Sequence, residues 1–210
     1  MKKEIAKALK EARKGKPRNF TQSVELAITL KNLDFKKPDS RVKGDVVLPH
    51  GRGKPLKIGA FAEGDMGVRA RKAGLKVFGK KDIQSLGEDK KKAKKIVSEH
   101  EFFIAQTDLM PLVGRTLGPV LGRSGKMPRP LSPVAPLEPL VEKLKKTVYI
   151  DSKNKNVVHS PIGTENMSDE ELTENAESIL NFVEKNLSRG MDNIESIYLK
   201  FTMGSAIKVI

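Results

Sequence analysis

The sequence predicts an α/β protein in which one domain is inserted into another. Near both ends of the chain lie strands with alternating apolar and polar residues, together with amphipathic helices. Between about residues 56 and 156, short apolar runs alternate with helical segments, which is typical of a parallel sheet covered by helices. We therefore expect a discontinuous α+β two-layer domain of residues 1–55 and 157–210, with an α/β domain of residues 56–156 inserted into it.

The N-terminal part is predicted to form a helix followed by strands. Residues 2–14 have the apolar spacing of one helix face, given by Ile5, Ala8, Leu9 and Ala12. Residues 23–31 alternate strictly, which predicts a half-buried strand. A polar turn at Pro38 and Asp39 and a short strand over residues 46–48 follow. The two strands together suggest an antiparallel hairpin.

The middle of the chain is predicted to form the inserted domain. Strands are expected over residues 56–62, 75–78 and 102–105, and helices over residues 66–73, 81–99, 109–117 and 139–147. Residues 118–139 are rich in glycine and proline, which favours an ordered loop.

The C-terminal part returns to alternating strands. Ser168 is placed to cap a helix, with Glu171 in the capping-box position, and Gly190 is a suitable stop after it. Residues 194–203 alternate as a half-buried strand does, and residues 207–210 can form a last strand.

Net charge is the most informative feature of the composition. The chain has 40 Lys and Arg against 26 Asp and Glu, a formal charge of +14. A field of this sign attracts polyanions, of which nucleic acid is the commonest soluble example. The alternative is a basic protein that merely stays soluble. A membrane partner is not expected, because the lysine-rich segments lack bulky apolar anchors, and the N-terminus begins no apolar signal core. We expect a cytoplasmic protein.

Several chemistries are excluded or disfavoured. Without cysteine there is no disulfide, thiol nucleophile or cysteine-ligated zinc, and the three histidines are at least 50 residues apart. The turn over residues 59–67 lacks both phosphate-binding glycine patterns, and its Glu63 and Asp65 would repel a phosphate. We expect no catalytic residue, metal or cofactor. A nucleotide-dependent enzyme using the inserted domain and a general nucleic-acid chaperone or DNA binder remain the alternatives.

The outward faces of the two alternating strands are the main candidate site. They contain Ser23, Glu25, Thr29 and Lys31 on one strand and Tyr198, Lys200 and Thr202 on the other. If the strands are neighbours, these side chains form one polar platform, where hydroxyls and a carboxylate can bond ribose 2′-OH groups. The alternative is an ordinary solvated face.

A second candidate is the segment of residues 114–130, which interleaves cations with glycine and proline. Glycines let the backbone approach an anion, and prolines stiffen a loop. We interpret the segment as a stiff basic loop with a possible second RNA contact at Arg123, Lys126 and Arg129. The lysines between residues 80 and 95 can contact phosphates too, or form a solvated helix face.

Five segments together resemble the ribosomal protein L1 family, in its shorter archaeal form. They are residues 20–25, 48–54, 117–122, 125–128 and 202–204, and they occur in the family's order over nearly the whole chain. The resemblance implies a discontinuous first domain and an inserted Rossmann-like second domain. It implies that the first domain contains the main RNA site.

The resemblance also implies particular contacts and partners. The RNA-binding residues carried over are Phe20, Thr21, Ser23 and Glu25 in the first motif and Thr202, Met203 and Gly204 in the second. Asn19 stands where the family often has a basic residue, with Lys16 or Arg18 as possible substitutes. The implied partners are the stalk rRNA of the large ribosomal subunit, the exit-site tRNA and the protein's own mRNA, whose translation it would repress. We expect a monomer when the protein is free of the ribosome.

Overall fold

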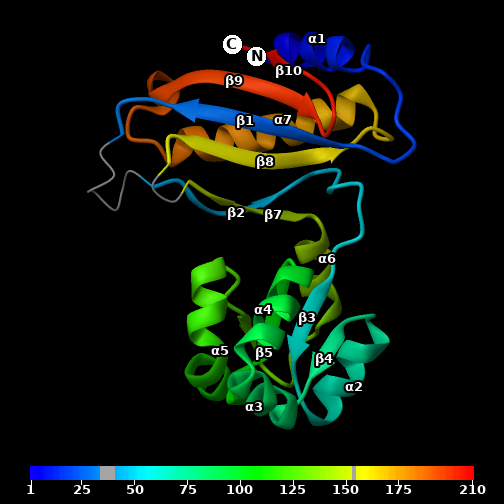
Figure 1. The fold of residues 1–210 in the computed structure, drawn as a ribbon, viewed down its shortest axis with the longest axis vertical. Coiled ribbons are helices and arrows are strands. Elements are labelled where there is room, and N and C mark those ends of the chain that lie inside the picture. Colours follow the sequence, from blue (N-terminus) through cyan, green and yellow to red (C-terminus); the bar gives the residue numbers. More distant parts are fainter. Residues whose placement is uncertain (34–40, 153–154) are drawn as a thin grey trace. The chain divides into compact units, whose positions relative to one another are not determined.

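The structure, a computed structural model, describes residues 1–33, 41–152 and 155–210, so the predicted turn at Pro38 and Asp39 lies outside the described residues. The chain divides into two compact units. Unit 1 comprises residues 1–54 and 145–210, and unit 2 comprises residues 55–144 (Figure 1). The sequence predicts the second boundary near residue 157. The structure has it earlier, because β7 (Thr147–Asp151) pairs with β2 (Lys43–Val47) of unit 1.

Unit 1 is built on a four-stranded antiparallel sheet. Its strands are β1 (Ser23–Leu30), β8 (Val157–Thr164), β9 (Ile194–Phe201) and β10 (Ala206–Lys208), in the order β10-β9-β1-β8. Helices α1 (Lys2–Ala12) and α7 (Asp169–Lys185) pack on one face, and a short 3-10 helix, Gly190–Asn193, precedes β9. The chain therefore presents one covered and one open sheet face.

The alternation of β1 explains the covered face. Val24, Leu26, Ile28 and Leu30 are buried, together with apolar residues of both helices. The Ser168 hydroxyl accepts a hydrogen bond from the Glu171 amide, and the Glu171 carboxylate accepts one from the Ser168 amide, so α7 begins with the predicted capping box. The inward row on β1 and the apolar stripe of α7 thus form one core.

The predicted hairpin between residues 23–31 and 46–48 is wrong. β1 is a central strand whose two edges pair with β8 and β9, so no edge is left for β2. β2 pairs instead with β7, about a hundred residues later, and this ribbon adds Val46 and Ile150 to the core of unit 1.

Unit 2 contains a four-stranded parallel sheet. The strands are β3 (Ile58–Phe61), β4 (Lys76–Phe78), β5 (Phe102–Gln106) and β6 (Arg129–Leu131), in the order β4-β3-β5-β6. The helices are α2 (Gly64–Lys72), α3 (Lys80–Glu88), α4 (Lys90–Glu99), α5 (Met110–Ser124) and α6 (Glu138–Lys145), with a short 3-10 turn, Thr107–Leu109, before α5. The predicted α/β fold class is confirmed.

Two predictions for unit 2 need correction. The helix expected over residues 81–99 is two helices, because Asp89 ends α3 and its carboxylate caps α4 by accepting from the amides of Lys91 and Lys92. The loop expected over residues 118–139 is wrong for its first part. α5 continues through Pro119 to Ser124, because its buried residues Val113, Leu117 and Leu121 recur every four positions.

Candidate nucleic-acid interface

Two stretches from opposite ends of the sequence meet at one end of the unit 1 sheet. Val24 is paired with Phe201 across the β1–β9 ladder, and Glu25 with Lys200. Beyond the ladder, the Thr202 amide donates to the Ser23 carbonyl at 3.0 Å, and the Thr202 hydroxyl accepts from the Ser23 amide at 3.0 Å. We call this surface the strand-end ridge; it comprises Phe20, Thr21, Ser23, Glu25, Lys200, Thr202, Met203 and Gly204.

The ridge exposes side chains that a folded domain normally hides. Phe20 is 49% exposed and Met203 is 56% exposed. Thr21, Glu25 and Lys200 are exposed as well. Aromatic and thioether groups beside hydroxyls and charges can contact sugars and bases while the polar groups bond them. The ridge therefore has the chemistry of a nucleic-acid contact surface.

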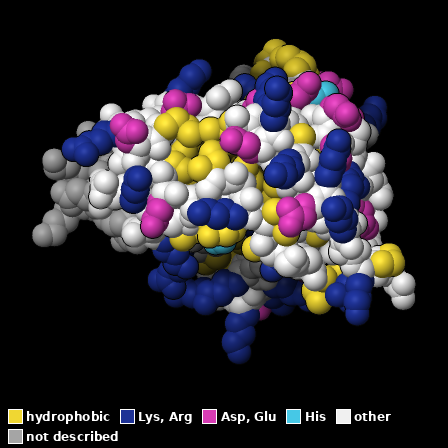
Figure 2. Space-filling view, turned by 90° about the horizontal axis from the view of Figure 1, so that it is seen from above, with side chains coloured by type: hydrophobic (Ala, Val, Ile, Leu, Met, Phe, Trp, Pro, Cys, Tyr) yellow, Lys and Arg dark blue, Asp and Glu magenta, His cyan; other side chains and the backbone are white. Residues whose placement is uncertain are grey.

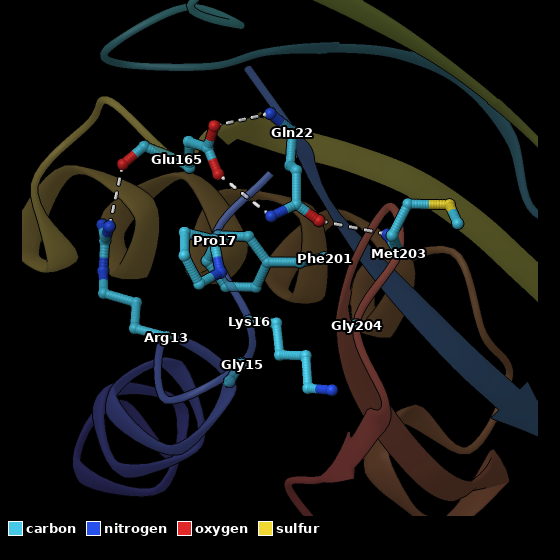
Figure 3. A pocket seen from close by; sticks show the side chains of 10 residues that line it. Arg13, Gly15, Lys16, Pro17, Gln22, Glu165, Phe201, Met203 and Gly204 are labelled. Atoms are coloured by element: carbon cyan, nitrogen blue, oxygen red, sulfur yellow. Dashed lines mark hydrogen bonds between the residues drawn. The ribbon is translucent and has the colours of Figure 1, made fainter. Parts of the chain in front are cut away.

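Gln22 and Glu165 support the ridge from beneath, and the sequence prediction did not include either of them. The Gln22 backbone amide and side-chain amide both donate to the Glu165 carboxylate, at 2.9 and 3.1 Å. The Gln22 side-chain oxygen accepts from the Met203 amide at 3.1 Å (Figure 3). Gln22 is buried. Its hydrogen bonds join the segment after β8 to the turn after β9. A signal was present: Gln22 continues the inward row of Val24 and Leu26, where a polar residue indicates a buried hydrogen bond.

Arg13 fastens the end of α1 to the same place. Its guanidinium donates to the carbonyls of Glu165 and Met167, at 2.8 and 2.6 Å, and pairs with the Asp169 carboxylate at 2.7 Å. The guanidinium also lies 5.9 Å from the centre of the Phe201 ring. A planar fork of donors can satisfy several acceptors at once, so Arg13 fixes the loop before α7 against the sheet.

A groove of about 310 Å³ lies beside the ridge. It is lined by residues from three segments: Ala12, Arg13, Gly15, Lys16, Pro17, Gln22, Glu165, Phe201, Met203 and Gly204 (Figure 3). Lys16 is among these lining residues, and Arg18 is not. Of the two cations considered as substitutes for a basic residue at Asn19, Lys16 is therefore the one that lines this groove.

The segment of residues 48–54 brings another cation to the ridge. The buried Asn175 amide of α7 donates to the carbonyls of Gly51 and Ile162, at 2.9 and 2.8 Å, and its oxygen accepts from the His50 amide. At Gly53, φ is +67° and a Cβ would lie 2.5 Å from the Thr164 hydroxyl, so only glycine fits. The segment so held lets the Lys54 amine donate to the Ser23 hydroxyl at 2.8 Å.

His50 adds a side-chain hydrogen bond between this segment and α7. Its Nε2 lies 2.6 Å from a Glu174 carboxylate oxygen. The hydrogen bond from His50 lowers the pKa of Glu174, although burial opposes the shift. The segment is thus held by one buried amide and one surface pair.

Lys31 is the predicted contact that the structure does not bring to the ridge. It follows β1 at the end opposite Ser23, eight residues away, which is roughly 27 Å along an extended strand. Its amide and carbonyl bond Asn193 there. Lys200, by contrast, lies across the ladder from Glu25.

The three cations of the predicted second contact lie on different parts of unit 2. The Lys126 amine donates to the carbonyls of Val97 and His100, at 3.0 and 2.7 Å, so it caps the end of α4. The Arg129 guanidinium lies 5.6 Å from the centre of the Phe102 ring. Arg123 is exposed on the last turn of α5. The interpretation as one stiff basic loop is therefore wrong, because residues up to Ser124 are helical.

Arg123 belongs instead to a groove between α4 and α5, with a volume of about 410 Å³. The groove is lined by Lys90, Lys94, Pro119, Val120, Arg123 and Ser124. Lys90 and Lys94 are one helical turn apart, and among the described residues neither they nor Arg123 has an ion-pair partner. We call Lys90, Lys94 and Arg123 the α4–α5 cations.

The face seen in Figure 2 shows lysine and arginine side chains spread among acids and around an exposed hydrophobic patch. No cluster of three or more His, Asp or Glu in the described ranges could hold a metal ion.

Every helix in those ranges falls short of the length and apolar character that a membrane span needs.

Comparisons with known proteins show the family to which the chain belongs. A model of the ribosomal protein L1p/L10e family matches residues 7–205. The large ribosomal subunit protein uL1 of Methanothermococcus thermolithotrophicus is 53% identical, over 98% of this chain and 97% of the relative. The proteins of the same name from Methanocaldococcus jannaschii and Pyrococcus abyssi are 49% and 50% identical, each over 98% of this chain and 94% of the relative.

Proposed function

Because the chain belongs to the ribosomal protein L1p/L10e family, we propose that it is a structural protein of the large ribosomal subunit that binds rRNA of the stalk region and catalyses no reaction. Its place would then be the cytoplasmic ribosome. The observation that supports this best is the strand-end ridge, whose two halves are 179 residues apart in sequence and are joined by the Thr202–Ser23 and Gln22–Met203 hydrogen bonds.

The ridge suits a folded RNA because the chain segments that carry it are held in position by hydrogen bonds within the protein. Hydrogen bonds within the protein already fix the side chains of Gln22, Arg13 and Asn175. RNA binding would therefore order few additional side chains. The exposed groups of the ridge would contact ribose and bases. Lysines elsewhere on the chain would add affinity and association rate without sequence preference.

Two finer roles extend this proposal. The same protein would contact the departing tRNA at the exit site. It would also repress translation by binding its own mRNA, where the message imitates the rRNA site. Both follow from the family resemblance, and a single preorganised surface can serve rRNA and mRNA if the two present the same folded backbone.

Unit 2 would supply a weaker contact through the α4–α5 cations. The Lys126 amine donates to a carbonyl at the end of α4, and the Arg129 guanidinium lies over the Phe102 ring. Of the three predicted residues, Arg123 is therefore the best placed to contact phosphate. Lys90 and Lys94 would join it.

The test compares exposed apolar residues in the two units. Phe20→Ala with Met203→Ala removes the apolar part of the ridge, and Val68→Ala with Met127→Ala removes side chains of 45% and 50% exposure from unit 2. We expect the ridge variant to bind a stalk rRNA fragment at least tenfold more weakly, and the unit 2 variant to bind it normally. Filter binding at constant salt measures both.

A general nucleic-acid binder is the competing function. It predicts equal affinity of the wild-type protein for the stalk fragment and for a duplex RNA of the same length at physiological salt. That equality, or equal binding by the two variants, would contradict the proposed function.

A further inference from the structure

The open face of the unit 1 sheet contains a row of side chains that the strand-end ridge does not include. Across the four strands, Lys208 is paired with Tyr198, Tyr198 with Ala27, and Ala27 with His159. Residues paired in this way point to the same side of a sheet. The row continues the side on which Glu25 and Lys200 are exposed, and α1 and α7 pack on the other side. We call these four residues the platform row.

The platform row places two flat rings on the sheet with a gap between them. Tyr198 and His159 lie two strands apart, which is about 10 Å, and only the methyl group of Ala27 stands between them. His159 is exposed and Tyr198 is half-buried. Rings separated by a small residue leave their faces accessible to a flat ligand.

The rows on either side add groups that suit a nucleotide. On one side, Lys200 is paired with Glu25 and with Ala206. On the other, Thr29 is paired with Ser196, which gives two hydroxyls. Lys200 and Lys208 lie towards the β10 side of the face and are exposed, so cations border the rings on one side. The face thus combines rings, hydroxyls and positive charge.

We propose that the platform row stacks unpaired bases of RNA, with Lys200 and Lys208 contacting the adjoining phosphates. An open four-stranded antiparallel sheet with aromatic residues on its central part is a known way to hold two or three unstacked bases. Each stacked base adds roughly tenfold to affinity and shows little sequence preference. The proposal rests on the proposed function, because the platform row borders the strand-end ridge and would receive bases that leave the same folded RNA.

The chain allows a direct optical test, because it contains two tyrosines and no tryptophan. Tyr149→Phe leaves Tyr198 as the single tyrosine. We expect a single-stranded uridine 12-mer to quench at least half of the Tyr198 emission, because a stacked base quenches an excited phenol. A fully paired duplex RNA of equal length should leave the emission nearly unchanged. No quenching by the 12-mer, or equal quenching by both RNAs, would overturn the proposal.

A binding measurement complements the fluorescence. Tyr198→Leu should weaken binding of the 12-mer about tenfold and leave duplex binding unchanged, and His159→Ala should act in the same direction. Tyr149→Leu, on β7, is the matched control, and circular dichroism checks the fold of each variant. Normal 12-mer binding by folded Tyr198→Leu and His159→Ala variants would also overturn the proposal.

Failure here is separable from failure of the proposed function. Phe20→Ala with Met203→Ala should weaken binding of the stalk fragment while leaving the quenching of Tyr198 by the 12-mer intact. If only the quenching fails, the ridge assignment stands and the platform row is an ordinary solvated face. If only the ridge variant binds normally, the platform row remains and the rRNA assignment falls.

Discussion

The strand-end ridge and the α4–α5 cations are both candidate RNA-contact surfaces, but they are built in opposite ways. At the ridge, Gln22, Arg13 and Thr202 are bonded to backbone groups from distant segments. On α4 and α5, the cations line an open groove, and no described acid pairs with them. The ridge is therefore preorganised, whereas the α4–α5 cations keep the freedom of long side chains.

This difference separates two tasks of an RNA-binding protein. A surface whose polar groups are fixed loses little entropy on binding and can reject RNA of the wrong shape. Free cations attract any phosphate, and their contribution falls with added salt. We expect substitutions beneath the ridge to reduce discrimination between RNAs, and substitutions of the α4–α5 cations to reduce salt sensitivity.

The largest effect is expected from Gln22→Leu. It removes one donor from the Glu165 carboxylate and leaves the Met203 amide without its acceptor. Because these groups are partly buried, the loss should lower the free energy of unfolding by about 2–3 kcal/mol and the affinity for the stalk fragment more than tenfold. Urea unfolding and filter binding measure the two effects. Gln84→Leu, at an exposed position on α3, is the control, and equal behaviour of the two variants would show that Gln22 holds nothing in place.

The next effect is expected from Arg13→Lys. Lysine keeps the charge, but a single amine cannot serve the Glu165 and Met167 carbonyls and the Asp169 carboxylate together. Since the side chain is 33% exposed, the loss in unfolding free energy should be about 1 kcal/mol. The affinity for the stalk fragment should fall several-fold. Arg71→Lys on α2 is the control, and an Arg13→Lys protein that matches it would show that charge alone matters at this position.

A smaller effect is expected from Thr202→Val. The variant keeps the shape and the 3.0 Å amide bond to the Ser23 carbonyl but loses both bonds of the hydroxyl. Discrimination between the stalk fragment and duplex RNA should fall by about 1 kcal/mol. Calorimetric titration with both RNAs measures it. Thr116→Val is the control, because the Thr116 hydroxyl donates to the Leu112 carbonyl within α5. If the Thr202→Val protein discriminated between the two RNAs as well as wild type does, the Thr202 hydroxyl would have no part in recognition.

The smallest effect on discrimination is expected when the α4–α5 cations are replaced together by glutamine. Discrimination should stay within a factor of about two. The slope of log affinity against log salt should flatten by about 2–3, because up to three phosphate contacts are lost. Glutamine at Lys57, Arg71 and Lys72, also in unit 2, matches the charge change. A slope that flattens equally in this control would show that only net charge matters.

The sequence predicted elements whose signals are local. The strict alternation of residues 23–31 matches β1, and Ser168 with Glu171 begins α7 as expected. Prediction from the sequence was wrong where contacts with residues distant in the chain determine the structure. β2 pairs with β7, which no local pattern indicates. α5 tolerates Pro119 because Val113, Leu117 and Leu121 are buried in the core of unit 2.

The candidate site shows the same division. Side chains that project from the two strand ends could be chosen from alternation and from family resemblance. The residues that hold these strand ends in place could not be predicted, because their partners are distant in sequence. Gln22 and Glu165 are 143 residues apart, and Arg13 and Met167 are 154 residues apart. The outward row of β1 predicts Lys31 as a contact, but the length of the strand places it at the opposite end of the sheet.

The central claim is that residues 20–25 and 202–204 form one RNA-contacting surface, and site-directed cross-linking tests it most directly. The chain has no cysteine, so Thr21→Cys, Ser205→Cys and Ser132→Cys each provide one attachment point for a photoreactive group. We predict that Thr21→Cys and Ser205→Cys cross-link to the same short segment of stalk rRNA, while Ser132→Cys on unit 2 does not. Cross-links from the first two positions to separate RNA segments, or yields no higher than from Ser132→Cys, would contradict the account.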